Sequence, residues 1–178
     1  LNSLVHNLNF FRSRLKPSIK IMAMVKAFSY GSGSHEIANV LQFHRVDYLA
    51  VAYSDEGVEL RNAGITLPIM VMNPEQQSFD ALVKYRMEPE IYSFRLLNQI
   101  SDFLKKSVLK EPFPVHLKID TGMHRLGFAP GRMDELILRL HDEPDISVKS
   151  VFSHLVASEE LKHDDFTKWQ IEQFNIAR

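Results

Sequence analysis

The sequence IKIMAMVKAFSYGSGSHE, residues 19–36, decides the fold class. Its first half is an almost continuous apolar run interrupted by Lys20, which is typical of a strand covered on both faces. Its second half is a glycine-marked turn that leads into a helical pattern. A doubly wound dinucleotide-binding sheet would place a third glycine in this turn, and residues 31–36 lack it. The stretch therefore favours a β/α barrel over an open doubly wound sheet.

The same strand-then-helix pattern recurs along the chain at intervals of roughly 20 to 30 residues. The later strand patterns cover residues 47–52, 68–72, 88–92, 114–120 and 146–152, of which 88–92 is the weaker and 114–120 alternates with a β period. Six such couplets predict βαβ units and a parallel sheet. A complete (β/α)8 barrel usually needs about 250 residues, whereas this chain has 178. We therefore expect residues 1–178 to form an incomplete (β/α)8 barrel of about six βα units.

The composition excludes several classes of protein. With 45% hydrophobic and 24% charged residues, the chain is expected to be globular rather than disordered. Its 21 basic and 22 acidic residues give no general attraction to nucleic acid or to an anionic membrane. No apolar run approaches the ~18 residues of a membrane helix. The absence of cysteine excludes disulfides, thiolate zinc sites and a cysteine nucleophile, and it fits a cytoplasmic setting.

Residues that can carry chemistry follow the first strand pattern, where the loops of a parallel barrel converge. Lys26 ends this strand. Partial desolvation there would leave more of its amine neutral and able to form a Schiff base, although a lysine whose ammonium simply reaches water is the open alternative. Tyr30 lies in the following loop, and Gly31 and Gly33 could let a phosphate approach the backbone.

Two later strand patterns also end in polar residues. The sequence KIDTGMHRLG, residues 118–127, leads from a strand into a loop that would hold Arg125 at the barrel mouth, where its guanidinium could bind a carboxylate. A surface Arg125 paired with Asp120 is the open alternative. His154 follows the sixth strand and could either be a core side chain or stack on a flat cofactor. The histidine and carboxylates after it match no metal-binding spacing, so no metal site is expected.

Three ordered motifs resemble the alanine racemases, which are pyridoxal-phosphate enzymes of the fold-type III barrel class. The motifs are MVKAFSYGSG at residues 24–33, KIDTGMHRLGF at 118–128 and FSHLVA at 152–157. Phe28, Ser29 and Ser32 depart from the commoner wording of the lysine motif. This wording resembles the racemase part of fused proteins that join a muramoyl-tripeptide:D-alanyl-D-alanine ligase to an alanine racemase, which implies a ligase domain upstream.

The resemblance implies a role for each motif residue. Lys26 would bind pyridoxal phosphate covalently and act as an acid or base on one face of the substrate Cα. Tyr30 would hydrogen-bond the cofactor phosphate, and His154 would pack against the pyridine ring. Arg125 would bind the phenolic oxygen of the cofactor and the substrate. Lys118 matches a position that is carbamylated in several family members, where the new carboxylate orients that arginine.

The resemblance also implies what lies outside this chain. The remaining barrel strands and a C-terminal β-domain, which carries the second base across a dimer interface, would follow residue 178. We therefore expect a homodimeric enzyme that interconverts L-alanine and D-alanine for peptidoglycan synthesis, with this segment inactive alone. The alternatives are a single-domain pyridoxal-phosphate carrier, another amino-acid enzyme on the same barrel, and a non-catalytic module of a larger fused protein.

Overall fold

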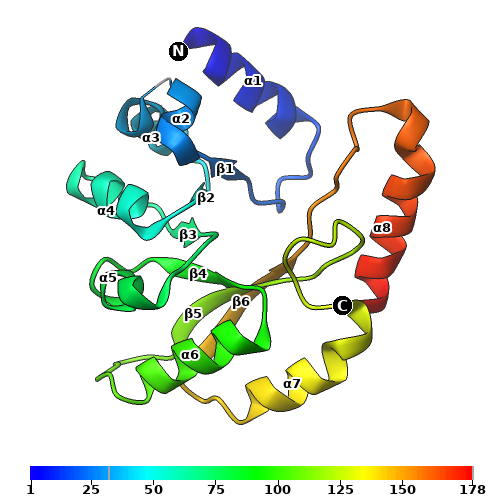
Figure 1. Cartoon of the computed structure of the whole chain (residues 1–178). Coiled ribbons are helices and arrows are strands. Elements are labelled where there is room, and N and C mark those ends of the chain that lie inside the picture. The colour runs from blue at the N-terminus through cyan, green and yellow to red at the C-terminus, as the bar shows by residue number, and fades with distance from the viewer. Residues whose placement is uncertain (32, 178) are drawn as a thin grey trace. The chain divides into compact units, whose positions relative to one another are not determined.

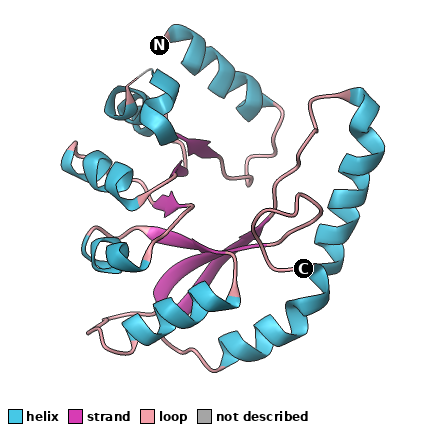
Figure 2. Ribbon diagram, viewed as in Figure 1, coloured by secondary structure: helices cyan, strands magenta, loops and turns pink. Residues whose placement is uncertain are grey.

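The computed structural model describes residues 1–31 and 33–177, so Ser32 of the lysine motif lies outside the described residues, as does Arg178. The described residues form six parallel strands, hydrogen-bonded in chain order from β1 to β6 (Figure 1). Helices separate the strands along the chain (Figure 2). The predicted parallel α/β architecture is confirmed, and the six strands are fewer than the eight of a closed barrel.

The chain divides into two compact units, and the first spans Leu1–Pro89. Its elements are α1 (Asn2–Ser13), β1 (Met22–Met24), α2 (Lys26–Gly31), α3 (Ser34–Phe43), β2 (Tyr48–Val51), α4 (Ser54–Asn62), β3 (Ile69–Val71), the short 3₁₀ helix η1 (Gln76–Ser78), α5 (Phe79–Lys84) and the start of β4 (Glu88–Ile91). The sheet forms the centre of this unit, because Leu49 of β2 pairs with Ile69 of β3 and neither side chain is exposed.

The second unit spans Glu90–Arg178. Its elements are the end of β4, α6 (Phe94–Leu104), β5 (Phe113–Lys118), η2 (Pro130–Arg132), α7 (Met133–His141), β6 (Ile146–Phe152), η3 (Leu161–His163) and α8 (Asp164–Ala177). The Ser93 hydroxyl accepts a hydrogen bond from the backbone N–H of Leu96 at 3.2 Å and so caps α6. Within residues 1–31 and 33–177, no helix is long and apolar enough to cross a membrane.

The first strand is shorter and more exposed than its sequence predicts. It covers only Met22–Met24, and each of these two methionine side chains is 39% exposed. β1 stands at the end of the strand order, where β2 is its neighbour, so one edge of β1 is left without a strand among the described residues. The prediction of a strand covered on both faces is therefore wrong for this part of the chain.

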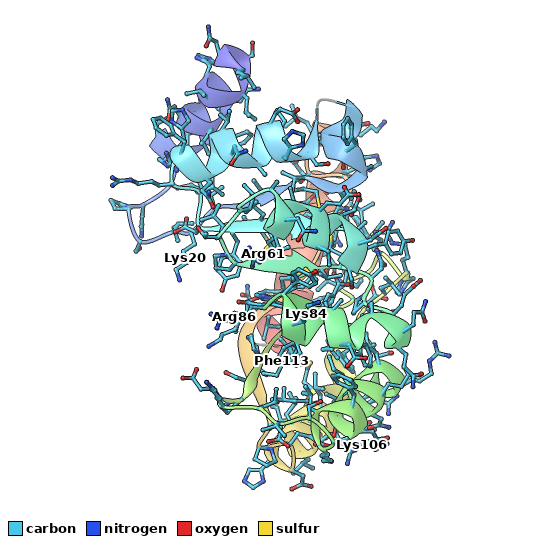
Figure 3. The ribbon with its side chains drawn as sticks, turned by 90° about the vertical axis from the view of Figure 1, so that its left-hand side faces the viewer. Lys20, Arg61, Lys84, Arg86, Lys106 and Phe113 are labelled. Carbon is cyan, nitrogen blue, oxygen red and sulfur yellow. The ribbon has the colours of Figure 1, made fainter. Side chains whose placement is uncertain are left out.

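Arg61 on α4 fixes the connections that lead into β3 and β4. Its guanidinium donates hydrogen bonds to the carbonyls of Ile65 and Leu67 at 2.8 and 2.7 Å. It also donates to the carbonyls of Tyr85 and Arg86 at 2.9 and 3.1 Å (Arg61 and Arg86 are labelled in Figure 3). One planar cation thus satisfies four carbonyls of two loops and sets where the two strands begin.

Candidate active site

Lys26 lies two residues beyond the end of β1 and begins a backbone turn of unusual hand. Residues 27–30 all have positive φ, at 50°, 55°, 50° and 56°, so the chain makes a left-handed turn immediately after the lysine. A left-handed conformation costs an L-residue roughly 1–2 kcal/mol. Strain of this kind persists only where surrounding contacts hold it, and it is concentrated at functional sites. The backbone that follows the half-buried Lys26 is therefore held by the fold in a conformation that L-residues disfavour.

The carboxylate of Glu56 on α4 holds this turn against the end of β2. Its Oε1 accepts a hydrogen bond from the backbone N–H of Ala27 at 2.6 Å. Its Oε2 accepts from the N–H groups of Ala52 and Tyr53 at 2.6 and 3.1 Å. Hydrogen bonds to a charged group contribute about 1.5–3 kcal/mol each. The sequence pattern does not reveal this role, because a glutamate in the first turn of a helix is ordinary.

Tyr30 ends the left-handed turn with its ring 72% exposed. It lines a hollow of about 440 Å³ together with Ser29 and Met24. The Ser29 hydroxyl oxygen is buried and has no hydrogen-bond partner among the described residues. The turn thus presents a phenol to solvent next to a hydroxyl that no other described residue engages.

In the second unit, Lys118 ends β5 and is buried against Glu90 of β4. The two strands are in register at Glu90 and His116, which places Lys118 two residues further along the same face. Lys118 Nζ lies 3.3 Å from Glu90 Oε1, with the two side chains 5% and 0% exposed. Lys118 Nζ also lies 5.5 Å from the centre of the Phe152 ring. The structure therefore places Lys118, a predicted site residue, beside Glu90, which the sequence analysis includes only in a strand.

Arg125 is exposed on a loop that Asp120 organises from within. Asp120 Oδ1 accepts hydrogen bonds from the backbone N–H groups of Gly122 and His124, both at 3.0 Å, and Oδ2 lies 3.4 Å from His124 Nδ1. Burial raises the pKa of Asp120, but the hydrogen bonds from His124 and Gly122 outweigh burial and lower it. The carboxylate of Asp120 is thus engaged with the loop's own backbone and with His124, not held in reserve for Arg125.

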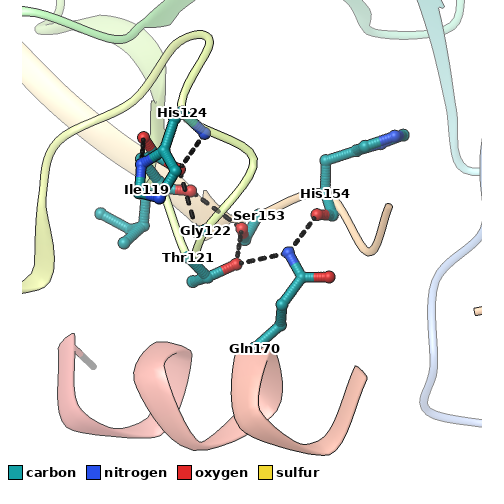
Figure 4. Close-up of polar contacts among 8 residues, drawn as sticks. Ile119, Thr121, Gly122, His124, Ser153, His154 and Gln170 are labelled. Carbon is teal, nitrogen blue, oxygen red and sulfur yellow. Dashed lines mark hydrogen bonds and ion pairs between the residues drawn. The ribbon is translucent and has the colours of Figure 1, made fainter. Parts of the chain in front are cut away.

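A network centred on Gln170 of α8 connects the Arg125 loop to the end of β6 (Figure 4). Gln170 is fully buried, and its Nε2 donates to Thr121 Oγ1 at 3.2 Å and to the His154 carbonyl at 3.0 Å. Its Oε1 accepts from the backbone N–H of Val156 at 3.1 Å. Thr121 Oγ1 in turn lies 2.7 Å from Ser153 Oγ. The backbone at His154 is therefore fixed, while its imidazole is exposed.

Replacing Gln170 by leucine should destabilise the protein without changing the shape of the side chain greatly. The change removes the Gln170 partner of the buried Thr121 hydroxyl and of the part-buried His154 carbonyl and Val156 N–H, so we expect the free energy of unfolding to fall by about 2–4 kcal/mol. Denaturant unfolding measures this loss. Gln173→Leu, the same change on the same helix outside this network, is the control, and equal stability of the two variants would contradict the role given to Gln170.

Parallel strands in chain order, followed by helices and carrying polar residues at their carboxyl ends, define the class of α/β-barrel proteins. Comparison with protein families then identifies the family within this class to which the chain belongs. The family described as alanine racemase, N-terminal domain, matches residues 1–178. The chain belongs to this family, as the three sequence motifs predict.

Individual relatives agree with the family. The chain is 37% identical to an alanine racemase of Treponema denticola, over 98% of this chain and 46% of the relative. It is 35% identical to a serine/alanine racemase of Enterococcus gallinarum, over 94% of this chain and 23% of the relative. The solved structure of an alanine racemase from Clostridium difficile 630 in complex with cycloserine is similar with a TM-score of 0.91 and 35% identity, over 99% of this chain and 48% of that chain. The chain thus spans about half the length of most of these alanine racemases.

Proposed function

We propose that the protein containing these 178 residues is a pyridoxal-phosphate-dependent alanine racemase. The observation that carries the proposal is the match of the whole chain to the racemase family, with Lys26 placed at the carboxyl end of the first strand. Its product D-alanine would serve peptidoglycan synthesis in the cytoplasm. As in the resemblance described above, the active form would be a homodimer that draws its second base from chain beyond residue 178.

The described residues of each unit have the chemistry that pyridoxal phosphate requires. In the first unit, the Lys26 amine would hold the cofactor, and the Tyr30 phenol would donate to its phosphate beside the Ser29 hydroxyl, which has no hydrogen-bond partner among the described residues. In the second unit, the Arg125 guanidinium suits an anionic oxygen and the exposed His154 imidazole suits a flat ring. When bound, the cofactor draws electron density from the substrate Cα and so makes its proton easier to remove.

Lys26 would transfer a proton on one face of the substrate Cα. A correctly placed acid or base contributes typically 10²–10⁴-fold to a rate, and this contribution depends on position. The backbone that carries Lys26 is held on one side by β1 and on the other by the Ala27 hydrogen bond to Glu56, at 2.6 Å. The left-handed turn therefore limits the positions that the amine can reach.

Arg125 would bind the carboxylate of alanine and the cofactor oxygen. An arginine can form two parallel hydrogen bonds to a carboxylate, which fixes orientation as well as charge. The loop that presents it is already ordered by Asp120 through Gly122 and His124. Such preorganisation lowers the cost of ordering the loop when substrate binds.

Replacing Arg125 by alanine in the full-length protein should lower kcat/KM for L-alanine by about 10²–10³-fold, because a donor aimed at the reacting group is lost. Its exposure predicts little change in melting temperature. Arg125→Lys should restore only part of the activity, since lysine lacks the planar pair of donors. Arg132→Ala, which removes an exposed arginine paired with Glu135, is the control. Wild-type kinetics in Arg125→Ala would contradict the assignment.

The function itself is tested by incubating the full-length protein with pyridoxal phosphate and L-alanine and measuring D-alanine by chiral chromatography. We expect racemisation in both directions. Cofactor binding without racemisation of any amino acid would favour a carrier protein instead. Because one relative is a serine/alanine racemase, L-serine is the second substrate to test, and a preference for serine would overturn the proposed substrate while leaving the reaction class intact.

A further inference from the structure

Glu90 is a buried carboxylate whose hydrogen-bonding capacity is largely unused. Its side chain is 0% exposed, and neither oxygen has a well-directed hydrogen bond among the described residues. The ammonium of Lys118, 3.3 Å away, is its ion-pair partner. A charge in this position is tolerated only where it is paired, because burial removes it from water. The pair must therefore have a role that outweighs the cost of burial.

The same pair lies at the base of the Arg125 loop. The loop closes on the backbone of Lys118, whose carbonyl accepts from the N–H of Phe128 at 2.8 Å, while the Phe128 carbonyl accepts from the N–H of Asp120 at 2.9 Å. Burial raises the pKa of Glu90 to about 7, and the positive charges of Lys118 and Arg125 oppose the rise. Arg125 is thus within the electrostatic reach of Glu90.

Lys118 can be an unmodified ammonium or a carbamate, and the two states differ in charge. As an ammonium, it gives one anion and two cations with Glu90 and Arg125. If its neutral amine instead added carbon dioxide, a new N–C bond would form, a proton would leave, and Lys118 would become a second buried carboxylate beside the first. Two like charges in a shared buried site disfavour each other strongly.

We propose that Glu90 is the resident carboxylate of this site, which keeps Lys118 as an unmodified ammonium and positions Arg125 by charge. The inference deepens the proposed function, on which the positioning role rests, and it departs from the carbamylation that the resemblance implies for Lys118. Glu90 is a positioning residue here, since it acts on substrate and cofactor only through Arg125. The charge state of Lys118 does not depend on the activity and can be tested without it.

The charge state is tested on the full-length wild-type protein, equilibrated with isotopically labelled bicarbonate at a pH well above the Glu90 pKa of about 7. Carbon nuclear magnetic resonance then reports any carbamate. We expect no protein carbamate signal. A signal that is present in the wild type and absent in Lys118→Arg would overturn the inference, whether or not the protein racemises alanine.

The positioning role is tested with Glu90→Gln, which keeps the shape of the side chain and removes its charge. We expect kcat/KM for L-alanine to fall by about tenfold or more, in the range seen when an outer-shell partner is removed. Without the Glu90 anion, a carbamate on Lys118 would no longer meet a like charge in the same buried site, so we expect added bicarbonate to label Lys118 and to restore part of the activity. Glu90→Asp should retain most activity without bicarbonate.

Glu143→Gln is the matched control, because Glu143 is a second buried glutamate paired with a lysine, at 2.9 Å from Lys105 Nζ. It should lose stability but gain neither a carbamate signal nor a dependence on bicarbonate. Unchanged kinetics in Glu90→Gln, or a loss that bicarbonate does not relieve, would overturn the positioning role. Absence of racemisation in the wild type would instead refute the proposed function and leave the labelling result valid.

Discussion

Lys26→Ala in the full-length protein should lower racemisation of alanine by on the order of 10³-fold or more, because one residue supplies both the covalent attachment of the cofactor and a proton-transfer group. Borohydride reduction of the wild type with pyridoxal phosphate should fix the cofactor irreversibly on one lysine. Peptide mapping should find it on the peptide that contains Lys26. In the variant, the same treatment should leave this region unlabelled.

Lys20→Ala provides the control for this experiment. Lys20 is exposed and precedes β1 on the same chain segment, whereas Lys26 follows it. The control should label and racemise like the wild type. Partial recovery of Lys26→Ala by a small added amine would show that the amine, not the fold, was lost. A reduced cofactor found on a different lysine would refute the assignment of Lys26.

Among glycine-to-alanine substitutions in the Arg125 loop, Gly127→Ala should cause the largest loss of stability. Gly127 has φ of +130°, and an added Cβ would lie 2.5 Å from the backbone nitrogen of Asp120 and 2.8 Å from the carbonyl carbon of Ile119. Backbone atoms cannot move aside as a side chain can, so the pairing of Asp120 with Phe128 should break. We expect a fall of about 3–5 kcal/mol in the free energy of unfolding, measured by denaturant titration.

Gly131→Ala is the corresponding control. It has no heavy atom within 4 Å of the added Cβ and no positive φ, and it belongs to the short helix η2. Alanine there should leave stability unchanged or raise it slightly, by about 0.4–1 kcal/mol, because it restricts the unfolded chain. Because the loop carries Arg125, kcat/KM should also fall in Gly127→Ala and not in Gly131→Ala. Equal stability of the two variants would show that the loop can relax around a Cβ.

Local sequence patterns predict some strands of this fold correctly and others only in part. The strand predicted at 146–152 matches β6 at both ends. The prediction for residues 19–27 is too long, because apolar composition cannot tell an edge strand from a central one. The left-handed turn at 27–30 carries glycine only after it, so its sequence gives no sign of positive φ.

The residues of the candidate site are likewise predicted from the sequence only in part. Lys26 and Arg125 are predicted from strand ends and Lys118 from the family resemblance, and the structure places them at or just beyond the carboxyl ends of β1 and β5. The prediction that His154 could be a core side chain is wrong, because the side chain is exposed. Glu90 was not foreseen, since a charged residue in a strand is normally exposed. Its role comes from a lysine on another strand, a contact that no local pattern contains.

The left-handed turn after Lys26 restricts which substitutions the lysine motif can accept during evolution. Ala27, Phe28, Ser29 and Tyr30 differ in size and polarity, yet none is β-branched. Valine, isoleucine or threonine at positive φ would be a steric outlier. Backbone chirality therefore disfavours β-branched side chains at these four positions, whatever their polarity.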